Sequence, residues 1–255
     1  MSTATEFRPK LLGIACNWCC YGGADLCGVS RFQYAPYIRL LRVMCSGRVD
    51  FSHIFRAFAD GLDGVFVGGC HINDCHYVTQ GNYDAYALFQ TCKRILEHIG
   101  LDPERLRLEW VSAGEGIRFA EIMNDYGARM QKRGPLGKAE GLDDGELRLR
   151  LRAVLRIVPY LRLVQAQRLQ APVRTEEECY RYFRTETFDR LCRELVLDVV
   201  TSSRILLELG AGPLPAAALS ERLGLGPSEL ARHLRRSANL GLVRYDMNRG
   251  GYSAA

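Results

Sequence analysis

The chain has 255 residues, of which 47% are hydrophobic and 25% are charged, the composition of an ordinary globular protein. These values exclude a fibrous repeat and an intrinsically disordered chain, and the length allows one large domain or two modest ones. The net charge of +5 at pH 7 is mild: it permits an acidic partner without requiring nucleic acid.

Neither a membrane span nor an export signal is apparent. No stretch approaches the roughly 18 uncharged apolar residues that a spanning helix needs. The first residues, MSTATEFRPK, lack the apolar segment of a secretory signal. We therefore expect a cytoplasmic protein. Thiols stay reduced in that compartment, so clustered cysteines indicate metal binding or redox chemistry.

Strand and helix patterns alternate through the first half of the chain. Apolar runs predict strands at Leu11–Cys16, Ile38–Cys45, Gly64–Cys70 and Arg105–Ala113. Helical spacing predicts helices at Phe51–Gly61, Tyr83–Gly100 and Gly116–Gly134. This alternation is typical of a parallel sheet flanked by helices, so we predict an α/β fold of the Rossmann or flavodoxin type.

The composition changes after a linker rich in glycine and proline. Glu146–Arg174 holds seven arginines and one glutamate in an amphipathic pattern that Pro159 should kink or split. This segment is either a helical face with solvated arginines or a docking arm for an acidic partner. Beyond it, a helix at Asp189–Gly210, a helix–turn–helix and a hairpin turning at Asn248–Gly251 form a winged-helix pattern.

These changes divide the chain into three predicted parts. An α/β domain spans residues 1–136, an arginine-rich helical linker spans 137–174, and a small winged-helix-like domain spans 175–255.

Three of the ten cysteines follow successive predicted strands. Cys16, Cys45 and Cys70 lie at the carboxyl ends of the first three strands, and in a parallel sheet these ends share the edge where ligands bind. Cys19 and Cys75 follow three and five residues after a strand-end cysteine, so their loops can fold back to the same place. Such a group of soft thiolates suits Zn²⁺ or an iron–sulfur cluster.

The other cysteines and the absence of common catalytic and nucleotide-binding motifs narrow the possible functions of the chain. Cys92, Cys179 and Cys192 sit at helical core spacing, and we interpret them as packing residues. We find no Ser/His/Asp pattern with supporting context, no GxxxxGK loop and no GxGxxG after the first strand. Cysteines stand at the strand end where a nucleotide-binding motif would otherwise lie. This arrangement favours an electron-relay function over a catalytic site.

Four segments carry a resemblance to a known family: ACNWCCYGGADLCGVSR, IRLLRVMCSGRVD, DGVFVGGCHINDCHYVTQGNYDA and LRLEWVSAGEGIRFAEIMNDY. They resemble the delta subunit of methyl-viologen-reducing hydrogenase, the MvhD family, over roughly residues 10–135. The resemblance implies one [2Fe–2S] cluster. It also implies that electrons pass between a hydrogenase or other oxidoreductase module and a flavoprotein of the heterodisulfide reductase HdrA type.

The resemblance also implies which residues hold the cluster. The family's cysteine pattern matches Cys16, Cys19, Cys45, Cys70 and Cys75. A [2Fe–2S] cluster takes four thiolates, so we rank Cys16, Cys45 and Cys70 first and Cys75 next, with Cys19 a neighbour or the alternate fourth ligand. Family members often have a small residue in place of Cys20 and alanine in place of Cys27, so these two thiols are departures from the pattern.

Side chains beside these cysteines have several possible roles. Trp18 either shields a cluster from water or belongs to an interface. For His71 and His76 we favour hydrogen bonding around the ligands, or helix capping, over ligation of a Rieske kind. Arg31 and Arg48 either stabilise a cluster's negative charge, pair with a partner or are simply solvated.

The winged-helix pattern lies outside the resemblance. Its second helix carries Arg232, His233, Arg235 and Arg236, which in a DNA-binding protein contact phosphates or base edges. Winged helices also dock proteins, and the fold alone does not decide between the two. Because the unit is fused to an electron-transfer domain, we favour docking over DNA.

The sequence therefore predicts a non-catalytic [2Fe–2S] electron-transfer subunit in a larger cytoplasmic redox complex. One alternative is a redox-sensing regulator whose DNA binding the cluster controls, and another is a scaffold stabilised by zinc. The electron donor and the acceptor stay open.

Overall fold

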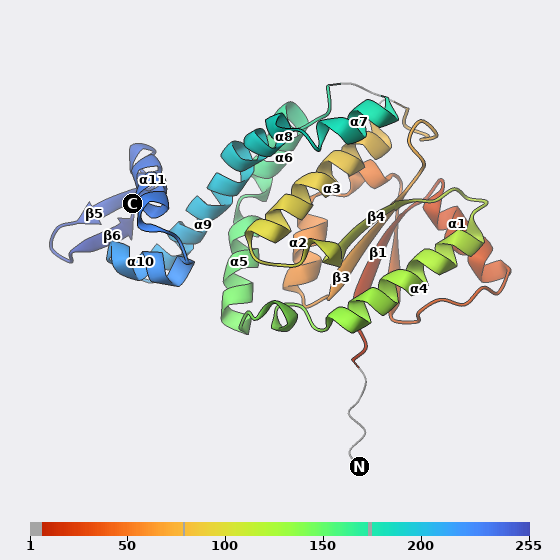
Figure 1. Ribbon diagram of the computed structural model, residues 1–255, viewed down its shortest axis with the longest axis horizontal. Helices are drawn as coiled ribbons and strands as arrows, with labels where there is room; N and C mark the ends of the chain where they lie inside the picture. Colours follow the sequence, from red (N-terminus) through yellow and green to blue (C-terminus); the bar gives the residue numbers. More distant parts are fainter. Residues whose placement is uncertain (1–6, 79, 173–174) are drawn as a thin grey trace, which may run out of the picture.

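The computed structural model describes residues 7–78, 80–172 and 175–255 (Figure 1). Its main sheet has four parallel strands in the order β2-β1-β3-β4, namely β1 (Leu11–Cys16), β2 (Ile38–Val43), β3 (Gly64–Gly69) and β4 (Leu106–Trp110). The predicted α/β fold is confirmed. This strand order is that of flavodoxin-like sheets, in which the order reverses between β1 and β3 and ligands bind at their carboxyl ends.

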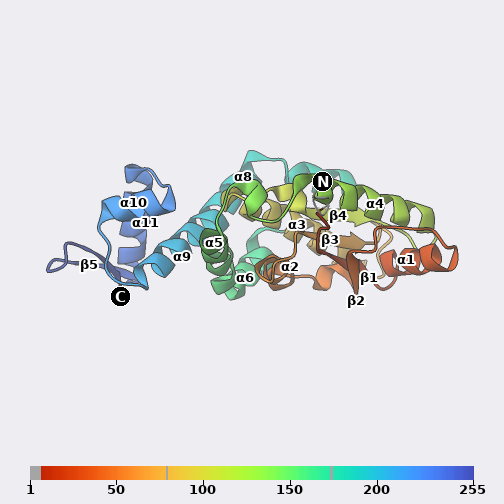
Figure 2. The same ribbon diagram turned by 90° about the horizontal axis from the view of Figure 1, so that it is seen from below.

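Helices cover both faces of the sheet (Figure 2). On one face α1 (Cys20–Val29) packs against α4 (Gly116–Arg133), and the other face carries α2 (Phe51–Ala59) and α3 (Gly81–His98). Each face has its own hydrophobic cluster. β3 lies in the interior and every one of its residues is buried, which explains its uninterrupted apolar sequence. Three short 3₁₀ turns complete this part, at Ser46–Arg48, Pro103–Arg105 and Lys138–Glu140.

Helix α1 is an element that the sequence pattern did not indicate. Its ten residues are glycine-rich and lack a clear polar face, so the helical periodicity is weak. The helix forms in close contact with the segment before α4. A Cβ at Gly22 would lie 2.9 Å from Ala113 Cβ, and one at Gly23 would lie 2.9 Å from the Ser112 carbonyl oxygen. Tertiary packing therefore overrides the poor propensity.

The arginine-rich segment forms two helices that cover α2. These are α5 (Asp144–Arg156) and α6 (Val158–Arg168), and the break at Ile157 confirms that the helix splits just before Pro159. Leu151, Val154 and Leu161 are buried in the same hydrophobic cluster as α2 and α3. The segment is thus part of the core packing, and residues 173–174 at its end lie outside the described residues.

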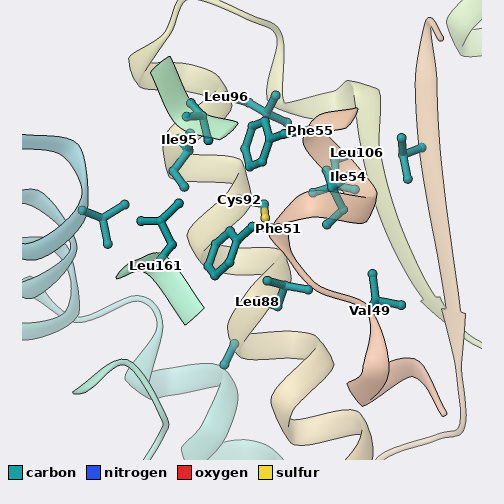
Figure 3. Packing of buried hydrophobic residues seen from close by; sticks show 14 of the residues in the cluster. Val49, Phe51, Ile54, Phe55, Leu88, Cys92, Ile95, Leu96, Leu106 and Leu161 are labelled. Carbon is teal, nitrogen blue, oxygen red and sulfur yellow. The ribbon is translucent and has the colours of Figure 1, made fainter. Parts of the chain in front are cut away.

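The cluster continues through the next helices. They are α7 (Glu176–Tyr182), α8 (Glu186–Cys192), a π-helical turn (Arg193–Leu197) and α9 (Asp198–Leu209). Cys92, Cys179 and Cys192 are all buried in it, as expected of packing residues. Figure 3 shows Cys92 among Phe51, Leu88 and their neighbours.

The C-terminal unit, residues 205–255, has a separate hydrophobic cluster built around Leu219, Leu230 and Leu234. It contains α10 (Ala216–Leu223), α11 (Pro227–Asn239), β5 (Val243–Asp246) and β6 (Gly251–Ala254). β5 and β6 form an antiparallel hairpin, so the predicted winged-helix-like arrangement is confirmed. This core begins near residue 205, whereas the domain boundary predicted from sequence lies at 174–175. The predicted domain limits therefore stay a prediction.

No helix within the described ranges combines the length and the apolar character required to cross a membrane.

Candidate metal centre

Two buried thiols meet where the strand order reverses. Cys16 is the last residue of β1 and Cys70 directly follows β3, so the parallel pairing of these strands brings their carboxyl ends together. The two Sγ atoms are 3.7 Å apart, and neither residue is exposed. A tetrahedral metal with metal–sulfur bonds of about 2.3 Å holds two thiolates about 3.8 Å apart. This pair therefore has the spacing of two ligands on one metal atom.

A second pair lies beside the first. The side chains of Cys45 and Cys75 interact with each other, and both residues are buried. Cys45 follows the edge strand β2, and its sulfur accepts a hydrogen bond from the Gly47 amide at 3.4 Å. The four cysteines form one packed group, which we call the thiol cluster, and half-buried Cys19 lies against it. All five predicted site residues are thus brought together. Their role as ligands stays a prediction.

The first turn of α3 positions two of these cysteines. The Asn82 side chain is buried, and its Nδ2 donates to the carbonyl oxygens of Cys70 at 3.1 Å and His71 at 2.7 Å. A Cβ at Gly81 would overlap the Cys75 sulfur. Sequence reasoning missed both residues. The sequence feature that could have indicated them is the Gly-Asn pair at the start of a helix, a few residues after two cysteines.

Hydrogen bonding between Cys16 and Cys70 shifts the pKa values of the two thiols in opposite directions. The hydrogen bond with Cys70 lowers the pKa of Cys16 to about 6 despite its burial, and backbone hydrogen bonds at Trp18, Cys19 and Ser46 add to this. The same contact, followed by burial, raises the pKa of Cys70. Burial raises the pKa of Cys45 to about 11. Of the Cys16–Cys70 pair, Cys16 is therefore the thiol that loses its proton more readily.

The donor set suits an iron–sulfur cluster. Its thiols are grouped as Cys16 with Cys70 and Cys45 with Cys75, and soft thiolates suit iron–sulfur clusters. In the part of the chain that the structure describes, no group of three or more His, Cys, Asp or Glu side chains is arranged to hold a metal ion. Because Gly81 has no side chain, its backbone approaches the Cys75 sulfur closely.

The flanking histidines lie beside the thiols. His71 Nε2 is 2.8 Å from Glu115 Oε2, and Glu115 also accepts from the Ser112 amide, so His71 ties the loop after Cys70 to the start of α4. His76 stacks on the Trp18 ring with centroids 4.2 Å apart. Trp18 itself is 42% exposed, so one side of its ring faces solvent.

The two thiols that depart from the family pattern belong to the other face of the sheet. Cys20 and Cys27 are buried in the hydrophobic cluster beneath α1. A Cβ at Gly68 would overlap the Cys20 sulfur, so that glycine makes room for the thiol. Burial raises the pKa of Cys20 and of Cys27, which keeps both protonated. They are packing groups.

The cations predicted on the second helix of the helix–turn–helix are three exposed arginines and one buried histidine. Arg232 Nη1 and Nη2 bind the two Asp198 carboxylate oxygens at 2.7 and 3.1 Å, and Arg236 Nη1 lies 3.5 Å from the same carboxylate. His233 is only 1% exposed. Arg232 and Arg236 keep 54% and 46% of their side chains exposed, and Arg235 is also exposed, so this surface does not decide between DNA binding and protein docking.

Fold and site together define a flavodoxin-like α/β domain that carries a thiol cluster where the strand order reverses. The family model described as "Methyl-viologen-reducing hydrogenase, delta subunit" matches residues 11–134. The iron-sulfur subunit of the F420-non-reducing hydrogenase of Archaeoglobus profundus is 48% identical over 130 residues, which are 51% of this chain and 94% of that protein. The chain belongs to the family of this delta subunit.

Two further relatives extend the comparison. The iron-sulfur subunit of the F420-non-reducing hydrogenase vhc of Methanococcus voltae is 48% identical over 132 residues, covering 52% of this chain and 91% of that protein. In Methanosarcina acetivorans, one subunit of the ferredoxin/F(420)H(2)-dependent CoB–CoM heterodisulfide reductase is 43% identical over 129 residues. The match covers 51% of this chain but only 16% of that protein. The family model ends before α5, so the C-terminal half lies outside it.

Proposed function

We propose that this protein is an electron-transfer subunit that holds one [2Fe–2S] cluster in its thiol cluster. It passes electrons between an oxidoreductase module and an HdrA-like flavoprotein within a larger cytoplasmic complex. The observation that carries the proposal is the convergence of four buried thiols from the ends of three strands, with Cys16 and Cys70 in position to share a metal atom.

The relatives support the choice of partners. Two of them are named iron-sulfur subunits of hydrogenases, and a third is a heterodisulfide reductase subunit that contains a related segment within its own, longer chain. A domain that occurs inside a heterodisulfide reductase subunit in one protein, and as a separate chain in others, is suited to work next to such a subunit.

The chain's own residues hold the group and shape its surroundings. A bound cluster takes up and releases one electron at a time. Cys16, Cys45, Cys70 and Cys75 provide the thiolates, and Cys19 is the alternate ligand. The Gly47 amide, which points at the Cys45 sulfur, stabilises negative charge there and so favours the reduced state. Burial of Cys16 and Cys70 keeps water away from the sulfurs.

Metal analysis of protein purified without oxygen tests this assignment. We expect about two irons and two acid-labile sulfides per chain, charge-transfer absorption in the visible, and a rhombic electron paramagnetic resonance signal after reduction. One zinc per chain with no sulfide would instead support the zinc scaffold and overturn the proposal.

A matched pair of substitutions tests the ligands. Cys45→Ser should leave less than roughly a tenth of the wild-type iron, because a hydroxyl replaces a soft thiolate ligand. Cys92→Ser makes the same chemical change in the hydrophobic core and should keep its iron, with a fall in stability of about 1–3 kcal/mol. Iron content and thermal unfolding are measured for both. Equal iron loss in the two variants would contradict the ligand assignment.

A further inference from the structure

The protein surface is hollowed beside Cys45. A cavity of about 180 Å³ is lined by this cysteine together with Gly47, Arg48, Tyr77, Gln80, Gly81 and Asp84. Cys45 is 4% exposed, whereas Cys16 and Cys70 are not exposed at all. The Cys45 side is therefore a place where solvent and other molecules approach the thiol cluster closely.

Exposed apolar side chains surround this opening. Trp18, Met44, Tyr77 and Val78 are 42%, 53%, 41% and 76% exposed. They belong to three segments, and each segment carries one of the packed cysteines. His76 joins two of them, because its ring stacks on Trp18 and meets the Tyr77 ring edge-on at 5.2 Å. Apolar groups grouped in this way are typical of protein interfaces.

The rim along the sheet edge is basic. β2 is an outer strand, and the stretch 38–48 contains three arginines and no acidic residue. All three, Arg39, Arg42 and Arg48, are exposed, and none forms an ion pair within the described residues. Arg42 lies over the Tyr21 ring at 5.0 Å. The nearby acids are Asp84, which lines the cavity, and Asp74, whose charge acts on the Cys19 thiol.

We propose that the Cys45 face, formed by Trp18, Arg42, Met44, Arg48, Tyr77 and Val78, is the surface on which an acidic redox partner docks and exchanges electrons. The proposal rests on the proposed function, since it requires a bound cluster. The unpaired arginines complement acidic side chains around the partner's own redox centre. A second copy of this chain is disfavoured, because a two-fold contact would place arginines opposite arginines.

Small redox reagents of opposite charge test the face on the full-length protein. The reduced protein gives one electron to hexacyanoferrate(III), which becomes hexacyanoferrate(II), or to hexaamminecobalt(III), which becomes cobalt(II). Stopped-flow absorbance yields both second-order rate constants. Their ratio largely cancels any change in the protein's reduction potential, because both reagents take the electron from the same protein.

The double variant Arg42→Glu/Arg48→Glu should lower the ratio of the anionic to the cationic rate constant by roughly tenfold or more at low salt. The effect should shrink steeply as salt increases. Poly-L-glutamate, which stands in for an acidic protein surface, should slow the anionic reaction of the wild type but not of this variant. Arg152→Glu/Arg156→Glu makes the same charge change on α5, where both arginines are exposed and belong to no ion pair among the described residues, and should leave the ratio nearly unchanged.

The possible failures are distinguishable. Equal ratios in the two double variants would overturn the Cys45 face as the site of electron exchange, even with a cluster present. A wild-type dimer that only Arg42→Glu/Arg48→Glu dissociates would assign the face to a second copy and also overturn the proposal. Wild-type protein without iron and sulfide would instead reject the function on which the proposal rests.

Discussion

At the scale of single residues, the thiol cluster depends on two neighbours that carry no sulfur. The Asn82 amide holds the carbonyls of Cys70 and His71, and the Gly81 backbone lies against the Cys75 sulfur. Each of these two residues affects the thiol cluster indirectly, by fixing where a cysteine lies. Both stand in the first turn of α3, so that turn couples the loop after β3 to the helix that covers the sheet.

Gly81→Ala should therefore disturb the thiol cluster more than the fold. The added Cβ meets the Cys75 sulfur, and the residue has a φ of +33°, which disfavours any side chain. We expect a loss of half or more of the bound iron, with a change in stability of about 1–2 kcal/mol. Iron content and thermal unfolding measure the two effects.

Gly28→Ala is the matched control for this substitution. Gly28 lies in α1, has nothing within 4 Å of its added Cβ, and should keep full iron content with equal or slightly higher stability. Full iron content in Gly81→Ala would contradict the role assigned to that position.

At the scale of elements, the contact between α9 and α11 holds the C-terminal unit in place. Asp198 at the start of α9 accepts hydrogen bonds from Arg232 and lies 3.8 Å from His233 Nε2. His233 is buried, and its Nδ1 has no hydrogen-bond partner among the described residues. Burial, followed by the charge of Arg232, lowers the pKa of this histidine from its usual 6.5. The neutral form is therefore the one that fits the folded protein.

This histidine should make stability depend on pH. Since its pKa is lower in the folded than in the unfolded state, its contribution is complete above about pH 6.5 and is lost as the pH falls. Asp198 and Glu229 oppose this shift, and Arg236 adds to it. Thermal unfolding followed between pH 7.5 and about 5 should show a steeper loss of stability for the wild type than for His233→Asn. Identical slopes would show that the histidine is not linked to folding.

At the scale of the whole molecule, one helix belongs to two hydrophobic cores. Val200 of α9 is buried with the sheet domain, whereas Ile205 and Leu209 are buried in the C-terminal unit. In Figure 1 this helix alone connects the two parts of the ribbon. The two cores should therefore be separable in their local stability.

Substitutions in each core test this separation. Leu234→Ala should cost about 2–4 kcal/mol and speed hydrogen exchange in residues 205–255, while β1–β4 keep their protection and the iron content is unchanged. Leu161→Ala, in the larger cluster, should do the reverse and speed exchange in the helices around α2 and α3. Faster exchange throughout the molecule in both variants would show a single cooperative unit.

Much of the fold was accessible from local pattern. The four strands, helices α2 to α4, the break before Pro159 and the terminal hairpin were all predicted within a few residues, because each has its own apolar period or turn residues. Helix α1 was not predicted, because its glycines and small residues give no helical hydrophobic periodicity. It forms in contact with α4.

The sequence by itself determined the parallel sheet and the placement of three cysteines at its carboxyl edge, because strand periodicity and residue order are local properties. Tertiary structure alone decided that Cys16 lies 3.7 Å from Cys70, and that Arg232 on α11 binds Asp198 on α9. It also decided that the arginine-rich helices cover α2. Each of these outcomes joins residues that are far apart in the chain, and which distant groups meet is settled only when the hydrophobic faces pack together.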